Sequence, residues 1–169
     1  MRSLTLLRHA KSSWQDRDLA DHERPLAERG RRDAPRMGER IAARGGRPAL
    51  ILTSSAKRAL ETAQIVARVL EPPRALGIEP ALYLADPGTI LDVIAGTDDS
   101  VTTLLVVGHN PGLTELVNRL LPDLRLDNLP TAGVVSMTST APTWRDVGAR
   151  NTTLAFYDFP KNPAPLTQG

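Results

Sequence analysis

The chain has 169 residues, a length that suits one domain with a hydrophobic core and excludes two domains of ordinary size. Its net charge is +2, and its 41% hydrophobic and 24% charged residues are typical of a globular domain, which excludes a disordered or membrane-embedded chain. It contains no Cys, so disulfides, thiolate metal sites and Cys nucleophiles are excluded.

Short apolar runs alternate with helical patterns along the chain, which indicates βα units around a mostly parallel sheet. In chain order the expected elements are a strand over 4–7, a helix over 32–44, a strand over 49–53, a helix after Ser54 or Ser55, a short strand over 82–84, a short helix from Pro87, a strand over 103–107, a helix from Pro111, and two late, possibly edge, strands over 134–138 and 153–159. The fold class that follows is an α/β three-layer sandwich with helices on both faces of the sheet.

Turn and cap residues set the expected ends of the helices. Pro35 fits only within the first turn of its helix, and Gly45-Gly46 and Pro72-Pro73 end the first two helices. Ser54 or Ser55 is the expected N-cap of the second helix. Asp86 and Asn110 are the expected N-caps of the two later helices, each with a Pro at the first helical position.

We expect residues 1–160 to form this single domain and the Pro-rich segment 161–169 to be a loose tail. The beginning MRSLTLLRHAK has too few apolar residues for a signal peptide, and no later apolar run approaches about 18 residues. A cytoplasmic protein that does not bind a membrane is therefore expected.

Three segments that carry chemically useful side chains fall at the C-terminal ends of predicted strands, where open α/β sheets bind ligands. They are Arg8-His9, the segment 54–58 and Gly108-His109. Arg58 lies in the first turn of its helix, where free N–H groups favour an anion, and Arg8 can bind two phosphoryl oxygens at once. The residue types predict a phosphate site.

A histidine among cations has a lowered pKa, so its free nitrogen can attack phosphorus and form a covalent intermediate. His9 is the candidate nucleophile, since its place at the strand end beside Arg8 leaves it little freedom to rotate away. His109 then stabilises the charge on the transferring group. The positive charge of the first 50 residues, with 12 Lys or Arg against 7 Asp or Glu, is compatible with an anionic ligand or with a solvated helix face.

Four segments together resemble the histidine phosphatase superfamily, and in particular its small SixA-type branch, whose members dephosphorylate protein phosphohistidine. They are LTLLRHAKSSW, RPLAERG, SSAKRALETA and VVGHNPG, in the order found in the family. The resemblance implies a phosphoglycerate mutase-like fold, His9 as nucleophile, and a phosphate pocket of Arg8, Arg58 and His109. Ala10 stands where the family usually has Gly, and SixA-type sequences often carry this Ala.

The sequence also departs from the family at the general acid. Larger members of the family use a carboxylate between the second Arg segment and the Gly-His segment. Glu79 and Asp86 are the close candidates, and Asp86 is favoured as a helix cap over a proton donor. An imidazole leaving group needs little acid help, so a weak acid position agrees with a phosphoramidate substrate.

Residues near the nucleophile segment have weaker assignments. Lys11, Ser12 and Ser13 are expected either to donate to phosphate oxygens or to shape the loop, and Arg24 either to reach substrate or to form a surface salt bridge. Trp14 is read as a lid or packing residue.

His22 is expected on a solvated loop, and the three histidines lack the close spacing of metal ligands, so no metal is expected. No nucleotide fingerprint is present, which leaves no expected cofactor.

The leading hypothesis is a metal-independent phosphohydrolase that acts through phosphohistidine, with a phosphohistidine-bearing protein as the possible partner. Two alternatives remain: a phosphatase of small phosphate esters by the same mechanism, and a phosphate-recognition module without turnover. Nucleic-acid binding is not expected, because the Arg residues are interspersed with Asp and Glu and no aromatic series accompanies them.

Overall fold

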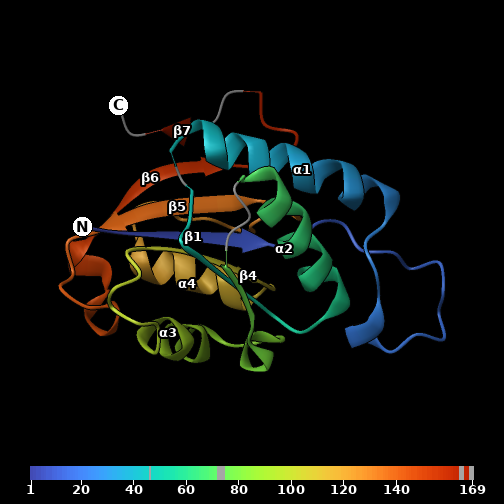
Figure 1. Ribbon diagram of the computed structural model, residues 1–169, viewed down its shortest axis with the longest axis horizontal. Coiled ribbons are helices and arrows are strands. Elements are labelled where there is room, and N and C mark those ends of the chain that lie inside the picture. The colour runs from blue at the N-terminus through green and yellow to red at the C-terminus, as the bar shows by residue number, and fades with distance from the viewer. Residues whose placement is uncertain (46, 72–74, 164–165, 168–169) are drawn as a thin grey trace.

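The computed structural model describes residues 1–45, 47–71, 75–163 and 166–167. Its centre is a seven-stranded sheet in the order β3-β2-β4-β1-β5-β6-β7, with helices on both faces (Figure 1). The strands are β1 (Arg2–Arg8), β2 (Leu50–Thr53), β3 (Ala75–Ile78), β4 (Thr103–Gly108), β5 (Val134–Ser139), β6 (Thr152–Asp158) and β7 (Leu166–Thr167). The helices are α1 (Glu28–Ala43), α2 (Lys57–Val69), α3 (Pro87–Ala95) and α4 (Gly112–Leu120), with short 3-10 helices η1 (Asp21–Glu23), η2 (Pro80–Leu82), η3 (Trp144–Asp146) and η4 (Ala149–Asn151).

The sheet is parallel where the site is built. Strands β3, β2, β4 and β1 run parallel to one another, while β5 pairs antiparallel with β1, β6 with β5 and β7 with β6. Side chains alternate across β1, so Leu4 and Leu6 pack into a core with α3 and α4, and Leu7 packs into a second core with α1 and α2. The predicted three-layer α/β class is therefore confirmed.

Helix α1 begins four residues before the predicted start, at Glu28, so Pro35 lies inside the helix and not in its first turn. Gly30 in the first turn packs closely against the loop that follows β1. A Cβ atom at this position would lie 2.2 Å from the carbonyl oxygen of Lys11. Residues 28–31 contain no apolar side chain, so an apolar periodicity does not include this first turn, and the start predicted from the sequence is too late.

Two other predicted elements are wrong. The strand expected over 82–84 does not form, because Leu82 belongs to η2 and the strand beside β2 is β3. Strand β3 lies at the sheet edge with only partly buried side chains, so its sequence ALGI carries little strand signal. The N-cap of α2 is Ala56 and not a serine. The Ser54 hydroxyl accepts from the backbone N–H of Ala56 at 3.2 Å and bonds to His109, so it does not cap the first turn of the helix.

Helix α3 confirms the predicted cap, because the Asp86 carboxylate accepts a hydrogen bond from the Thr89 backbone at 2.8 Å. Helix α4 starts one residue later than predicted, with Pro111 as N-cap. Asn110 still contributes there, since its side-chain oxygen accepts from the Thr114 hydroxyl at 2.8 Å.

The remaining predicted boundaries fall partly outside the described residues. Gly46 and Pro72-Pro73 lie outside them, as do residues 164–165 and 168–169 of the tail. Within the tail that was expected to be loose, Leu166–Thr167 pair with β6. No helix formed by the described residues is long and apolar enough to cross a bilayer.

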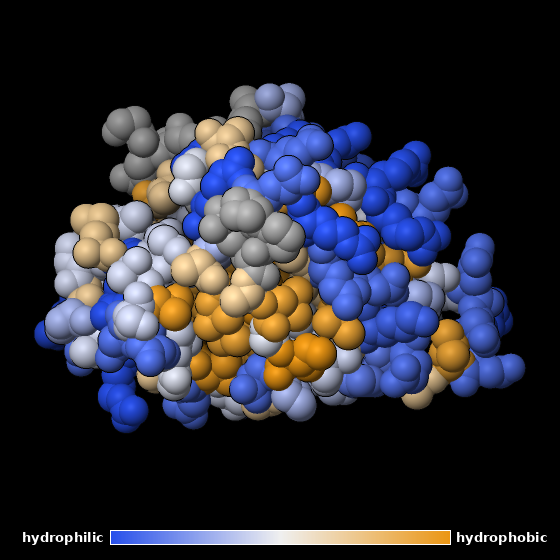
Figure 2. Space-filling view, viewed as in Figure 1, coloured by the Kyte–Doolittle hydropathy of each residue, from blue (hydrophilic) through white to orange (hydrophobic). Residues whose placement is uncertain are grey.

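The surface is strongly divided by polarity. Figure 2 shows a largely hydrophilic surface over α1, and a hydrophobic patch between the positions of α2 and α3. A groove of about 510 Å³ opens beside η2 and α3, with Leu50, Leu52 and Val93 in its lining together with Glu79 and Asp92.

Candidate active site

The site lies where β1, β4 and β2 end side by side. Arg8 is in register with Gly108 across the parallel pair β1 and β4, so the residues that follow, His9 and His109, are neighbours. Their ring centroids are 5.2 Å apart. The end of β2 brings Ser54 to the same place, since its backbone N–H donates to the carbonyl of Val107. Adjacent strand ends thus bring together groups that are far apart in the sequence.

His9 is held with one ring nitrogen bonded and the other free. It is 7% exposed, and its Nδ1 lies 2.8 Å from the carbonyl oxygen of Ala10. A carbonyl only accepts, so Nδ1 carries the proton and the lone pair is on Nε2. Burial and then the nearby guanidinium groups lower the pKa of His9 to about 4, although the bond to Ala10 raises it. At neutral pH the ring is therefore unprotonated.

The His9 loop is tied to helix α2. The backbone N–H of Ala10 donates to the Thr62 hydroxyl at 3.0 Å, and that hydroxyl donates to the carbonyl of Arg58 at 2.7 Å. Ala10 is fully buried and is not among the described residues with positive φ, so its methyl group fits where a Gly is usual.

His109 is 2% exposed, and its Nε2 lies 2.8 Å from the hydroxyl oxygen of Ser54. Its Nδ1 is buried without a hydrogen-bond partner. Burial, and after it the neighbouring His9 and Arg58, lowers the pKa of His109 to about 3. The neutral ring keeps one N–H to donate, and Ser54 fixes its orientation.

Three arginines surround the histidines. Arg8 donates to the carbonyl of Leu129 at 3.0 Å, and its Nε is buried without a partner. Burial, followed by the charge of Arg58, lowers the pKa of Arg8. Arg24 is buried as well, with its Nη2 2.6 Å from the hydroxyl of Ser12. Guanidinium groups of this kind suit a phosphoryl group.

These side chains line one pocket of about 230 Å³. Its described lining residues are Arg8, His9, Lys11, Ser12, Trp14, Arg24, Arg58, Leu84, His109, Asn110 and Thr131. The structure thus brings together the predicted nucleophile, the predicted phosphate ligands and three of the weaker candidates, Lys11, Ser12 and Arg24, whereas Ser13 lines a neighbouring cavity. We call this cavity the catalytic pocket.

Asp86 is not part of that lining. Its exposed carboxylate caps α3 through Thr89, and these hydrogen bonds lower its pKa. A lowered pKa makes a carboxyl group a poorer proton donor at neutral pH. Glu79 accepts from the backbone of Ala81 and lines the separate groove beside α3.

Asp21 and Tyr83 are two polar groups at the site that were not predicted from the sequence. Arg58 donates to the backbone oxygen of Asp21 at 2.7 Å and to its Oδ2 at 2.9 Å. Arg24 donates to Oδ1 at 3.1 Å, and the Tyr83 hydroxyl donates to Oδ2 at 2.5 Å. The Tyr83 bond, and then Arg58 and Arg24, lower the pKa of Asp21 to about 2. Asp21 therefore remains an anion that holds two arginines.

Tyr83 also contacts the histidines edge-on, at 5.5 Å between its ring centroid and that of His109. On its other side lies His22, whose ring centroid is 4.9 Å away. His22 is partly exposed, and its Nε2 lies 2.9 Å from the Ser55 hydroxyl. The place of Asp21 at the site could not be predicted, because no spacing pattern links residue 21 to residues 58 and 83.

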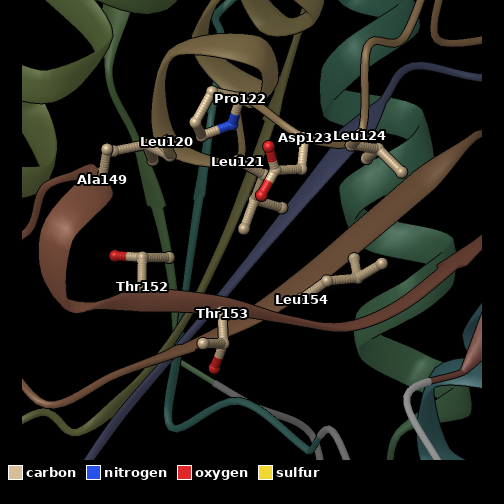
Figure 3. A pocket seen from close by; sticks show the side chains of 9 residues that line it. All are labelled: Leu120, Leu121, Pro122, Asp123, Leu124, Ala149, Thr152, Thr153 and Leu154. Atoms are coloured by element: carbon tan, nitrogen blue, oxygen red, sulfur yellow. The ribbon is translucent and has the colours of Figure 1, made fainter.

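Another pocket, of about 310 Å³, lies away from the histidines at the C-terminal end of α4 and the start of β6 (Figure 3). Leu120, Leu121 and Leu154 contribute to its lining, and Asp123 is the one titratable side chain among its nine described lining residues. It offers no cation for a phosphate. Among the described residues, no group of three or more His, Asp or Glu side chains is placed to hold a metal ion.

Known proteins match both the sequence and the fold. The sequence model of the histidine phosphatase superfamily (branch 1) matches residues 4–83. The uncharacterized protein Rv1276c of Mycobacterium tuberculosis is 33% identical over 164 residues, which cover 92% of this chain and 100% of that protein.

Solved structures agree. The candidate phosphohistidine phosphatase SixA from Agrobacterium tumefaciens is 28% identical and superposes with a TM-score of 0.80, over 94% of this chain and 98% of the other. The protein histidine phosphatase SixA in complex with tungstate shares the fold, with 23% identity and a TM-score of 0.77 over 94% and 97% of the two chains. The chain belongs to the histidine phosphatase superfamily, and its α/β fold is the phosphoglycerate mutase-like fold of the SixA structures.

Proposed function

We propose that the protein is a metal-independent phosphatase that works through a covalent phosphohistidine on His9, with protein phosphohistidine as its substrate. The observation that carries the proposal is the fixed His9 ring, whose Nδ1–H is held by Ala10 while Nε2 is free in a pocket lined by Arg8 and Arg58. A neutral imidazole nitrogen among guanidinium groups is the arrangement that nucleophilic attack on a phosphoryl group needs.

In the first step, His9 Nε2 forms a bond to phosphorus while the bond from phosphorus to the leaving group breaks. Arg8, Arg58 and Arg24 bind the phosphoryl oxygens and balance their negative charge. In the second step, a water oxygen attacks the same phosphorus, the bond to Nε2 breaks, and inorganic phosphate leaves. The proton released by that water leaves with phosphate or passes to solvent, which restores neutral His9.

The leaving group is the feature that favours phosphohistidine over phosphate esters. Among the described residues that line the catalytic pocket there is no carboxyl group, and the nearby Asp21 is ionised. An alkoxide leaving group needs a proton donor, whereas an imidazole that is already protonated on its other nitrogen leaves without one. The site therefore suits a phosphoramidate. Its substrate is expected in the cytoplasm.

Trapping the intermediate tests the proposal. Brief incubation with a radiolabelled phosphohistidine peptide in the presence of a chelator should leave a label on wild type that survives alkali and is lost in acid. His9→Ala should carry none. Equal labelling of both proteins contradicts the role of His9, loss of turnover with the chelator contradicts metal independence, and a strong preference for a sugar phosphate over the peptide contradicts the substrate. Turnover that His9→Ala abolishes also excludes a recognition module without activity.

A further inference from the structure

The catalytic pocket is small for a complete substrate. Its volume is about 230 Å³, whereas pockets that enclose small-molecule ligands usually measure about 300–1,000 Å³. It has room for a phosphoryl group and the ring that carries it. The rest of the substrate must then contact the surface outside this pocket.

A second cavity, of about 430 Å³, lies beside the catalytic pocket along the loop after β1. Lys11, Ser12 and Trp14 line both cavities, so the two are adjacent. The new cavity extends between that loop and the start of α1, where Ala27 and Arg31 belong to its lining. We call it the Trp14 groove. In Figure 1 the loop runs out to the right of the sheet, beyond the end of β1.

The backbone of the groove is fixed before any ligand arrives. Ser12 and Leu26 form an isolated antiparallel bridge, the N–H of Ser13 donates to the carbonyl of Pro25 at 2.8 Å, and the N–H of Ala27 donates to that of Lys11 at 2.8 Å. A surface that is ordered in advance loses less entropy on binding than a flexible loop.

Trp14 gives the groove an apolar contact surface beside the catalytic arginines. The Arg24 guanidinium lies over its ring, 3.2 Å from the centroid, which fixes the ring next to the phosphate site. Even so, 66% of Trp14 is exposed. A large, rigid aromatic ring left uncovered next to a reactive pocket is the kind of side chain that anchors protein interfaces.

We propose that the Trp14 groove binds the polypeptide on one side of the phosphorylated residue of a protein substrate, with an apolar or aromatic side chain of that polypeptide on the Trp14 ring. This inference rests on the proposed function and adds where the protein part of the substrate lies. The position of the groove beside the catalytic pocket favours this occupant, because the polypeptide that flanks a phosphorylated side chain held in the pocket lies against the surface around it.

Two substrates and three variants test the groove. The substrates are a short phosphohistidine peptide with apolar flanking residues and phosphohistidine as the free amino acid. For Trp14→Ala, kcat/KM should fall about tenfold more for the peptide than for the amino acid, the size expected for one lost aromatic contact. Ala27→Trp, which fills the groove, should have at least the same selective effect. Leu19→Ala is the matched control, because Leu19 is exposed on the same loop but lines neither cavity.

The outcomes separate the groove from the chemistry. A selective loss for the peptide in both groove variants, with Leu19→Ala equal to wild type, supports the proposal. Equal losses for both substrates overturn it, because Trp14 then acts on catalysis through Arg24. Unchanged kinetics in Trp14→Ala and Ala27→Trp also overturn it. A wild-type protein that turns over neither substrate refutes the proposed function itself, and the groove with it.

Discussion

Two buried neutral histidines should make the protein less stable as the pH falls. Burial, as the largest cause, lowers the pKa of His9 to about 4 and that of His109 to about 3, whereas a histidine in the unfolded chain has a pKa of about 6.5. Because the folded values lie below the unfolded value, protons bind the unfolded chain first. Stability is therefore lost as the pH falls through about 6.5 towards the folded values.

The size of the effect follows from the two shifts. At about pH 5.5, an unfolded histidine gains about 1.4 kcal/mol from a proton that the folded ring does not take up. Two such rings give about 3 kcal/mol between about pH 7.5 and about pH 5.5, a large part of the roughly 5–15 kcal/mol that stabilises a typical domain. The carboxyl groups contribute little in this interval, because both states are ionised there.

Urea unfolding measures this difference, in buffers without phosphate or sulfate, since a bound oxyanion would stabilise the folded state. The double variant His9→Asn, His109→Asn should lose most of the pH dependence, while it keeps His22 and every carboxylate. In NMR titrations of wild type, the ring signals of His9 and His109 should not shift between about pH 5 and about pH 8. A pH dependence that is the same in wild type and the double variant, or a His9 signal that titrates near pH 6.5, would refute the reasoning.

Three further substitutions test single contacts. Asp21→Asn should lower kcat about tenfold or more, because the variant loosens Arg58. Inhibition by tungstate, an oxyanion, should not weaken, because the variant also removes a negative charge from the site. Weaker inhibition with unchanged kcat would contradict this role of Asp21. Asp86→Ala should lower the free energy of unfolding by about 1 kcal/mol through the lost cap and leave kcat within about twofold; a large fall in kcat would instead make Asp86 the proton donor. Gly112→Ala should lower the free energy of unfolding by about 1–3 kcal/mol, because a Cβ atom there would lie 1.9 Å from the carbonyl oxygen of Ala85. In the control Gly88→Ala, the new Cβ atom meets nothing closer than 3.6 Å. Equal stability of the two variants would contradict the prediction, because α4 then adjusts to the added methyl group.

The ends of neighbouring parallel strands could be predicted from the sequence because their signals are local. Each of β1, β2 and β4 is a mostly apolar run, and the residue that follows it is a histidine after β1 and β4 and a serine after β2. Parallel strands end at the same edge of a sheet. That rule is enough to bring together Arg8, His9 and His109. It gives no distances, and it does not say which ring nitrogen is free.

The rest depends on contacts that no local pattern records. Asp21 in η1 contacts Arg58 in the first turn of α2 and Tyr83 just after η2, across separations of 37 and 62 residues. Strand β3 could not be predicted for another reason: the side chains of this edge strand are exposed or only partly buried, so they lack the alternation of a buried strand. The bond between Ser54 and His109 forms because β2 and β4 are adjacent, and the local sequence around Ser54 does not show that adjacency.

The proposed reacting groups all lie at one end of the sheet, so the other end has no part in the proposed chemistry. In Figure 1 the N-terminus lies at the opposite end of β1 from His9. The turn at 97–102, which leads into β4, lies at that same far end. A fluorophore, an affinity handle or an inserted peptide at this end should leave turnover intact. Immobilisation through this end would therefore leave the catalytic pocket exposed to solution.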